Sequence, residues 1–168
     1  AEFPAQFQLV AAMNPCPCGY LGETRCRCTE DQVNRYRAKV SGPLLDRIDM
    51  LVEVPQVAQS ALRHDVVDSD EETSDVVRER VAEARQRQYD RAGVVNAVLD
   101  NEALAKYCPL VDSDYQLLEN VISRLGLSAR AYHRIIKVAR TIADLADSSQ
   151  IQTPHITEAI AYRRLDKQ

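Results

Sequence analysis

Apolar residues recur at helical spacing through most of the second half of the sequence. The clearest case follows Ser128, where apolar residues three or four positions apart continue to about residue 146. This spacing places them on one face of a helix, and Ser128 is a suitable N-cap. Caps, glycines and prolines bound the other apolar stretches in the same way. The predicted helices cover about residues 75–91, 100–107, 112–125, 128–146 and a last one that starts at Thr153.

The first third of the chain has a different pattern. Residues 7–13 (FQLVAAM) form a nearly continuous apolar run that ends at the polar Asn14. Residues 48–54 (IDMLVEV) alternate in part, and a proline follows each run. Short apolar runs ended by proline are typical of strands, and a run without alternation suits a strand covered on both faces. We therefore predict two strands, with a helix at about residues 29–40 between them.

An acidic stretch separates these two parts. Residues 64–75 (HDVVDSDEETSD) carry many carboxylates and no helical apolar stripe, which indicates a linker. The predicted organisation is an α/β part at residues 1–58, an acidic linker at 59–75 and a helical bundle at 76–168. The fold class is mainly α.

Composition narrows the function classes. The net charge of −4 argues against a strongly basic, free-standing nucleic-acid binder, although local basic patches stay possible. No apolar run approaches the ~18–20 residues that span a bilayer, so we expect a cytoplasmic protein with no membrane partner.

Four of the five cysteines lie in one loop, as two Cys-x-Cys pairs. Two such pairs can close a tetrahedral thiolate site around Zn²⁺, which is the interpretation we favour. Free or partly oxidised thiols and disulfides are the alternatives, and disulfides are disfavoured in a cytosolic chain. The predicted ligands are Cys16, Cys18, Cys26 and Cys28. Cys108 stands alone on a helical stretch and is predicted to be a small buried residue.

Several arginines allow two interpretations. Arg47 lies at the end of a short helical turn and is flanked by Asp46 and Asp49. It would either form a local salt bridge or reach a phosphate on a neighbouring molecule. Arg130, in the first turn of a helix, would either bind an anion or pair with an acidic neighbour. Basic residues near the cysteine loop would either face solvent or contact nucleic acid. They are Arg25, Arg27, Arg35, Arg37 and Lys39.

Three motifs add to this reading: MNPCPCG at residues 13–19, SGPLLDRID at 41–49 and SARAYHR at 128–134. Together they resemble the magnesium-chelatase-like AAA+ ATPases, most closely the ComM branch of bacterial competence proteins. The resemblance covers essentially the whole chain. It implies the C-terminal portion of an AAA+ α/β core, with two strands and the cysteine loop, followed by a helical lid.

The resemblance also implies roles for single residues. Asn14 would be the sensor-1 residue that orients the attacking water, and Arg47 the arginine finger that reaches the nucleotide of the adjacent subunit. Arg130 would be the sensor-2 arginine of the lid, and Asn14 and Arg130 would both contact ATP. The complete protein would use ATP and Mg²⁺ and form a hexameric ring. It would drive DNA branch migration or unwinding in natural transformation and recombination, on single-stranded or branched DNA.

One departure from the family is clear. The sequence contains neither a Gly-x-x-x-x-Gly-Lys-Ser/Thr phosphate loop nor a strand ending in Asp-Glu. We therefore expect a C-terminal portion of an ATP hydrolase that is inactive alone. The alternatives are the ATPase subunit of a magnesium-chelatase-type complex and a zinc-stabilised DNA-binding module that uses Tyr20, Arg25 and Arg27.

Overall fold

The computed structural model describes residue 1, residues 7–55 and residues 72–163. These fall into two compact units, Ala1–Leu45 and Asp46–Gln168. The first contains α1 (Glu30–Arg37) and α2 (Gly42–Leu45). The second contains α3 (Ser74–Ala92), the 3₁₀ turn η2 (Asn96–Val98), α4 (Asn101–Tyr107), α5 (Asp112–Leu125), α6 (Ala129–Leu145) and α7 (Thr153–Ala161). Most of the predicted acidic linker lies outside the described residues, so the boundary placed there stays a prediction.

The two predicted strands are absent from the described residues. Residues 7–14 and 48–54 form neither strand nor helix, and the apolar side chains of the first segment lie in solvent. Phe7 is 77% exposed and Val10 84% exposed. A strand exists only through hydrogen bonds to a neighbouring strand, and the described part of this chain supplies none. The prediction of strands was wrong for this structure, although the apolar run that prompted it is real.

The helix of the first unit follows its local sequence. Thr29 caps α1 through its side chain, which accepts a hydrogen bond from the Gln32 amide N–H, while the Gln32 side chain accepts one from the Thr29 amide. This reciprocal pair satisfies two donors that would otherwise lack partners at the helix start. The predicted start of this helix is confirmed.

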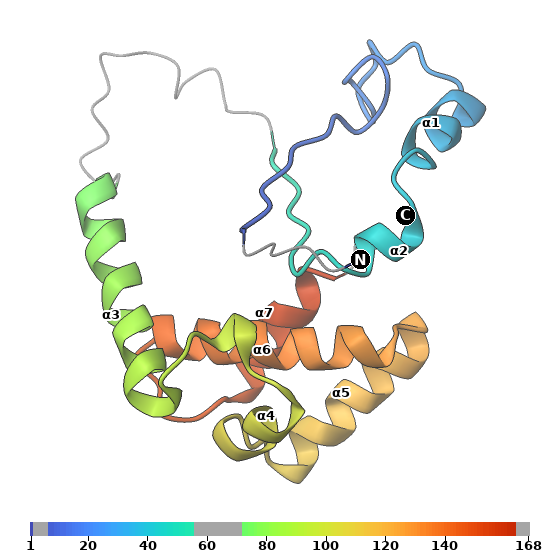
Figure 1. Cartoon of the computed structure of the whole chain (residues 1–168). Coiled ribbons are helices and arrows are strands. Elements are labelled where there is room, and N and C mark those ends of the chain that lie inside the picture. The colour runs from blue at the N-terminus through green and yellow to red at the C-terminus, as the bar shows by residue number, and fades with distance from the viewer. Residues whose placement is uncertain (2–6, 56–71, 164–168) are drawn as a thin grey trace. The chain divides into compact units, whose positions relative to one another are not determined.

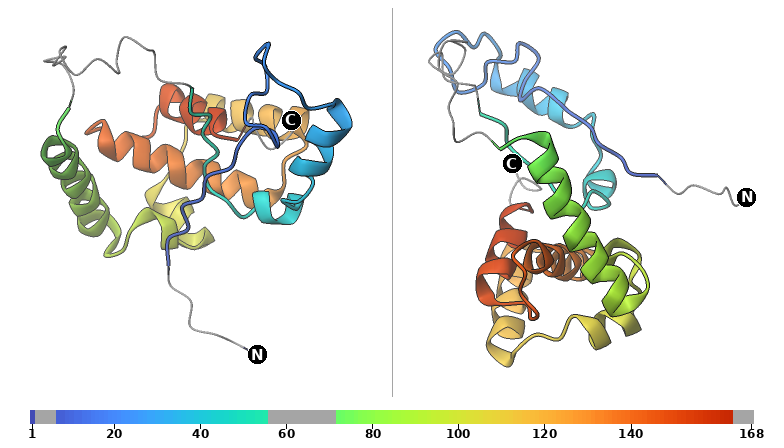
Figure 2. Two further views of the ribbon diagram at one scale, coloured as in Figure 1. Left: turned by 90° about the horizontal axis from the view of Figure 1, so that it is seen from above. Right: turned by 90° about the vertical axis from the view of Figure 1, so that its left-hand side faces the viewer.

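The second unit is a helical bundle with α6 at its centre (Figures 1 and 2). Helix α7 packs along α6, and α3 crosses α6 near the C-terminal end of α6. Gly93 and Gly126 end α3 and α5 in the left-handed conformation, with φ of 71° and 52°. Glycine adopts this conformation without steric cost, and so it stops a helix. Helix positions predicted from caps and glycines are confirmed across this unit.

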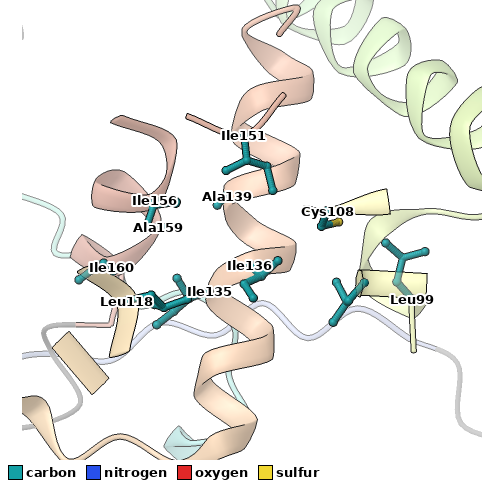
Figure 3. Close-up of a cluster of buried hydrophobic side chains, with 11 residues drawn as sticks. Leu99, Cys108, Leu118, Ile135, Ile136, Ala139, Ile151, Ile156, Ala159 and Ile160 are labelled. Atoms are coloured by element: carbon teal, nitrogen blue, oxygen red, sulfur yellow. The ribbon is translucent and has the colours of Figure 1, made fainter. Parts of the chain in front are cut away.

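The core of the bundle is aliphatic. Side chains from α4 to α7 meet around Leu118, Ile135 and Ile156, each at most 1% exposed (Figure 3). Cys108 lies in the same cluster at 2% exposure, as predicted for a small buried residue. Burying one leucine or isoleucine side chain contributes about 1.5–3 kcal/mol, so this cluster is the main source of stability in the unit.

Val77, Val81 and Ala84 lie at helical spacing in the sequence, which predicts one apolar face for helix α3. In the structure Ala84 is buried but Val81 is 51% exposed. Polar side chains hold the helix instead: Arg87 donates to the Asp144 carbonyl, and Gln88 accepts from the Asn96 amide. The second half of α3 is therefore anchored by hydrogen bonds to loops and to α6.

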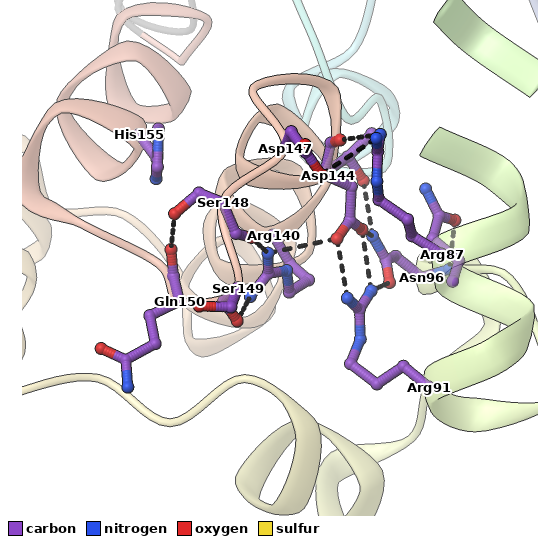
Figure 4. A network of polar contacts seen from close by, with 12 residues as sticks. Arg87, Arg91, Asn96, Arg140, Asp144, Asp147, Ser148, Ser149, Gln150 and His155 are labelled. Carbon is purple, nitrogen blue, oxygen red and sulfur yellow. Dashed lines mark hydrogen bonds and ion pairs between the residues drawn. The ribbon is translucent and has the colours of Figure 1, made fainter. Parts of the chain in front are cut away.

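A buried polar network lies where α3 meets α6. Asp144 is 1% exposed, and both its carboxylate oxygens accept hydrogen bonds from Arg91 at 2.7 Å (Figure 4). Asn96 donates to the same carboxylate at 2.9 Å, and Arg140 pairs with it at 3.1 Å. The carboxylate raises the pKa of Arg91, whereas burial lowers the pKa of Arg140. One buried carboxylate thus serves two arginines.

Candidate functional site

The four cysteines of the loop gather their sulfur atoms in one cluster. All four Sγ atoms lie within 4.8 Å of one another. Cys16 lies 3.4 Å from Cys18 and 4.0 Å from Cys26, and Cys18 lies 3.6 Å from Cys26 (Sγ to Sγ). Cys16 is fully buried, and the other three are half-buried. None of the four forms a disulfide.

Tight turns build this cluster. The Gly19 amide donates to the Cys16 carbonyl, and the Cys26 amide donates to the Glu23 carbonyl, both at 3.0 Å. Gly19 and Gly22 have φ of 81° and 86°, the left-handed region that favours glycine. The two turns reverse the chain between the cysteine pairs, so that the second pair folds back against the first.

The sulfur spacing suits a tetrahedral metal ion. Four sulfurs bonded to Zn²⁺ at about 2.3 Å stand about 3.8 Å from one another, because that is the edge of the tetrahedron. The separations among the sulfurs of Cys16, Cys18 and Cys26, 3.4–4.0 Å, bracket this value, and the Cys28 sulfur lies within 4.8 Å of all three. A divalent cation would also compensate the repulsion among several thiolates. The geometry therefore fits a tetrahedral metal ion held by four thiolates.

The thiols differ in acidity. Backbone hydrogen bonds from Arg27 and Tyr20 lower the pKa of Cys18 to about 6. Loss of solvation raises the pKa of Cys28 to about 12. Cys18 is thus the first of these two sulfurs to become a thiolate, the form that binds metals.

The basic residues of the first unit are partly engaged. Arg25 pairs with Glu23 and lies over the Tyr20 ring at 3.8 Å from its centroid. Two of the side chains in the predicted DNA contact are therefore packed on each other. Arg35 and Arg37 belong to the last turn of α1, where cations are favoured by the helix dipole, which accounts for them without a ligand.

Asn14 lies beside the cysteine loop. Its side-chain nitrogen is 3.8 Å from the position that a Cβ on Gly19 would occupy, and Asn14 itself is exposed. It belongs to the first unit, whereas Arg47 and Arg130 belong to the second. The sensor-1 assignment stays a prediction.

The segment that carries Arg47 is tied to the lid helices. Asp46, directly before Arg47, accepts a hydrogen bond from the Ser128 hydroxyl at 2.8 Å and one from Arg130 at 3.2 Å. These contacts, the Ser128 hydrogen bond first, lower the pKa of Asp46. The structure thus places Arg130 next to the residue adjoining Arg47, although 84 positions separate Arg130 from Asp46 in sequence. Arg47 itself is exposed.

Two further arginines hold the same segment. Arg134 of α6 pairs with Asp49, and Arg163, which is 1% exposed, donates to the Ile48 carbonyl. The Leu51 amide donates to the Tyr162 carbonyl at 3.0 Å. These partners could not be named from the sequence, because its pattern predicts a solvent-facing side chain for Arg134. The only available signal was the pair of acidic residues that flank Arg47.

Two family models match the chain. Residues 71–163 match the C-terminal domain of magnesium chelatase, subunit ChlI, and residues 1–62 match magnesium chelatase, subunit ChlI. The chain belongs to the magnesium chelatase ChlI family. Within this family it is a ComM-branch, magnesium-chelatase-like protein.

Several longer proteins contain a segment similar to this chain. It is 48% identical over 164 residues to the competence protein ComM of Haemophilus influenzae, covering 98% of this chain and 32% of that protein. It is 44% identical to the uncharacterised protein YifB of Escherichia coli and 33% identical to an uncharacterised protein of Mycobacterium tuberculosis, again over 98% of this chain. Those matches cover 32% and 33% of the relatives. The chain therefore spans about a third of the length of each of these family members.

No helix among residues 7–55 and 72–163 is both long and apolar enough to cross a bilayer.

Proposed function

We propose that this chain is the nucleotide-sensing and lid portion of a hexameric AAA+ ATP hydrolase of the cytoplasm. The observation that carries the proposal is the contact between the lid helix α6 and the Arg47 segment. Arg130, at the N-terminus of α6, donates a hydrogen bond from its guanidinium Nη1 to the carboxylate Oδ2 of Asp46 at 3.2 Å. A phosphate oxygen carries the same kind of charge, so Arg130 is suited to bind the phosphates of ATP.

The complete protein would bind ATP with Mg²⁺, which neutralises charge on the phosphates. Arg130 would contact the nucleotide of its own subunit, and Arg47 would extend to the nucleotide of the next. Asn14 would orient the attacking water. These three residues hold and orient reactants, which is the main catalytic contribution in phosphoryl transfer.

The chain alone should not hydrolyse ATP. It has no phosphate loop to cradle the β- and γ-phosphates and no Asp-Glu strand end to help hold the metal. Phosphate release from ATP should match the buffer control for this chain and be readily measured for the full-length protein. ATP hydrolysis by the chain alone, if it persists through repeated purification, would contradict the prediction that this chain is inactive without the rest of the protein.

The cysteine cluster supports zinc as the metal of the loop. Four cysteine sulfurs within 4.8 Å of one another match the ligand set that Zn²⁺ prefers. In this position the metal would fix the loop rather than take part in hydrolysis, because four protein ligands leave no open site.

Metal analysis tests this assignment. Protein purified without chelator should contain about one zinc per chain, as expected for a closed Cys₄ site. Cys16→Ser should bring the content below half of that, since it removes a buried ligand, whereas Cys108→Ala should retain it because Cys108 lies in the helical core. A zinc-free wild-type protein, or equal zinc loss in both variants, would rule the site out.

DNA is the proposed substrate of the complete motor. The name of the Haemophilus relative, a competence protein, supports a role in natural transformation. The activity we propose is branch migration or unwinding of single-stranded or branched DNA.

A separate DNA-binding role for the cysteine loop has weaker support, because Arg25 already pairs with Glu23 and lies over Tyr20. A chelatase-type ATPase subunit is the other candidate, and the family match favours it equally as far as ATP use is concerned.

A further inference from the structure

Asp46 is the meeting point of three side chains from two helical regions. The Ser128 hydroxyl donates to Oδ1 at 2.8 Å, Arg130 donates to Oδ2 at 3.2 Å, and Arg163 lies 3.7 Å from Oδ1. The side chain of Asp46 is 27% exposed, so water reaches it only in part. The roles proposed for Asn14, Arg47 and Arg130 leave this carboxylate without a function.

The three contacts are not equivalent. Arg163 is 1% exposed and also holds the Ile48 carbonyl, and Ser128 is the fixed cap of α6. Arg130, in contrast, has a side chain that is 55% exposed and meets Asp46 through one nitrogen. Arg130 can therefore leave Asp46 while Ser128 and Arg163 stay.

A bound nucleotide would draw Arg130 away. A triphosphate carries several negative charges, against one on the carboxylate, and offers a guanidinium two oxygens at once. Arg130 cannot satisfy Asp46 and a phosphate with the same donors. The two anions are therefore competitors for one guanidinium.

We propose that Asp46 is a positioning residue that couples the two arginines of the ATPase cycle. Without nucleotide it holds Arg130 and fixes the segment that leads into Arg47. When Arg130 turns to the phosphates of its own subunit, this segment loses one of its attachments, and Arg47 changes its position toward the neighbouring subunit. The inference rests on the proposed nucleotide roles of Arg130 and Arg47.

The same segment offers a matched control. Asp49 lies three positions beyond Asp46 and pairs with Arg134, one turn further along α6 than Arg130. Asp49→Asn removes the same charge from the same segment and leaves Arg130 with its partner. A general effect of negative charge or of segment anchoring should appear in both variants, and an effect specific to Arg130 only in Asp46→Asn.

The test uses the full-length protein, with a non-hydrolysable ATP analogue and Mg²⁺ as the probe. Asp46→Asn keeps an oxygen to accept from Ser128 but frees Arg130, so binding of the analogue should tighten about two- to five-fold, the range expected for loss of one exposed competing ion pair. The kcat should fall, because the Arg47 segment is already released before nucleotide binds and no longer responds to it, while the KM falls with the Kd. Asp49→Asn should leave binding of the analogue unchanged, and Asp46→Glu should restore kcat.

The Arg130→Ala background separates the possible results. There, Asp46→Asn should no longer tighten binding, because its effect passes through Arg130. Tightening that persists without Arg130, or unchanged or weaker binding by Asp46→Asn alone, overturns the coupling role of Asp46. If Arg130→Ala itself leaves analogue binding intact, the proposed nucleotide role of Arg130 fails first. If Arg130→Ala weakens binding and Asp46→Asn behaves as wild type, only the inference about Asp46 fails.

Discussion

Asp144→Ala is expected to lower the free energy of unfolding of the helical unit by about 3–5 kcal/mol, the cost of breaking a buried ion pair from one side. The carboxylate is 1% exposed and is shared by Arg91 and by Arg140, which is itself 2% exposed. Its removal leaves two guanidinium groups without their counter-charge. Asn96 also loses one of the two acceptors of its side-chain nitrogen and keeps only the Thr141 hydroxyl at 3.0 Å.

Urea unfolding followed by circular dichroism measures this loss. Asp147→Asn is the matched control, because Asp147 lies three residues away and pairs with Arg87 through a side chain that is 79% exposed. Exposed pairs contribute about 0–1 kcal/mol, so the control should stay near wild type. Asparagine also tolerates the left-handed conformation of Asp147, whose φ is 54°. Equal destabilisation by the two variants would show that the buried network is not what joins α3 to α6.

One part of this network, the Arg140–Asp144 pair, can be recognised in the sequence. Arg140 and Asp144 are four residues apart and interrupt the apolar face of α6, the most strongly patterned helix of the chain. Charged residues on an apolar face indicate buried partners, because an isolated buried charge is very costly. The sequence could not identify Arg91 or Asn96 as the partners, because Arg91 lies 53 residues and Asn96 lies 48 residues before Asp144.

Local and distant determinants account for what could be predicted. Helix limits follow from caps and glycines within a few residues of each end, which is why the helices of the bundle were predicted correctly. Strands depend on partners elsewhere, so the apolar run at residues 7–13 was misleading on its own. The cysteine cluster was predictable because its ligands lie within thirteen positions of each other, whereas the contact of Asp46 with Arg130 was not, since it spans 84.

The same limit applies to Arg47. Asp46 and Asp49, the acidic residues on either side of Arg47, pair with Arg130 and Arg134 of the lid. These pairs anchor the segment, and Arg47 is exposed. An exposed arginine on an anchored segment has the properties that an arginine finger needs, namely access to a neighbouring subunit and a fixed base.

Arg47→Ala should therefore lower the ATPase kcat of the full-length protein by ~10³-fold or more, the range known for arginine fingers. Zinc content should not change, because the cysteine loop lies in the other unit. Arg78→Ala is the matched control: Arg78 is also exposed and pairs only locally, with Asp75 on α3. Loss of activity in both variants would indicate general damage rather than a missing finger.

A mixing experiment distinguishes a finger that acts on the neighbouring subunit from one that acts within its own. Subunits with Arg47→Ala keep their own phosphate loop, and subunits with a disabled phosphate loop keep Arg47. In a mixed ring, some interfaces join an intact phosphate loop to an intact Arg47, and these should hydrolyse ATP although each variant alone does not. If Arg47 served its own subunit, every site in the mixture would lack one of the two groups, and mixing would restore nothing. Recovery of activity on mixing therefore requires both a ring and an Arg47 that crosses its interface.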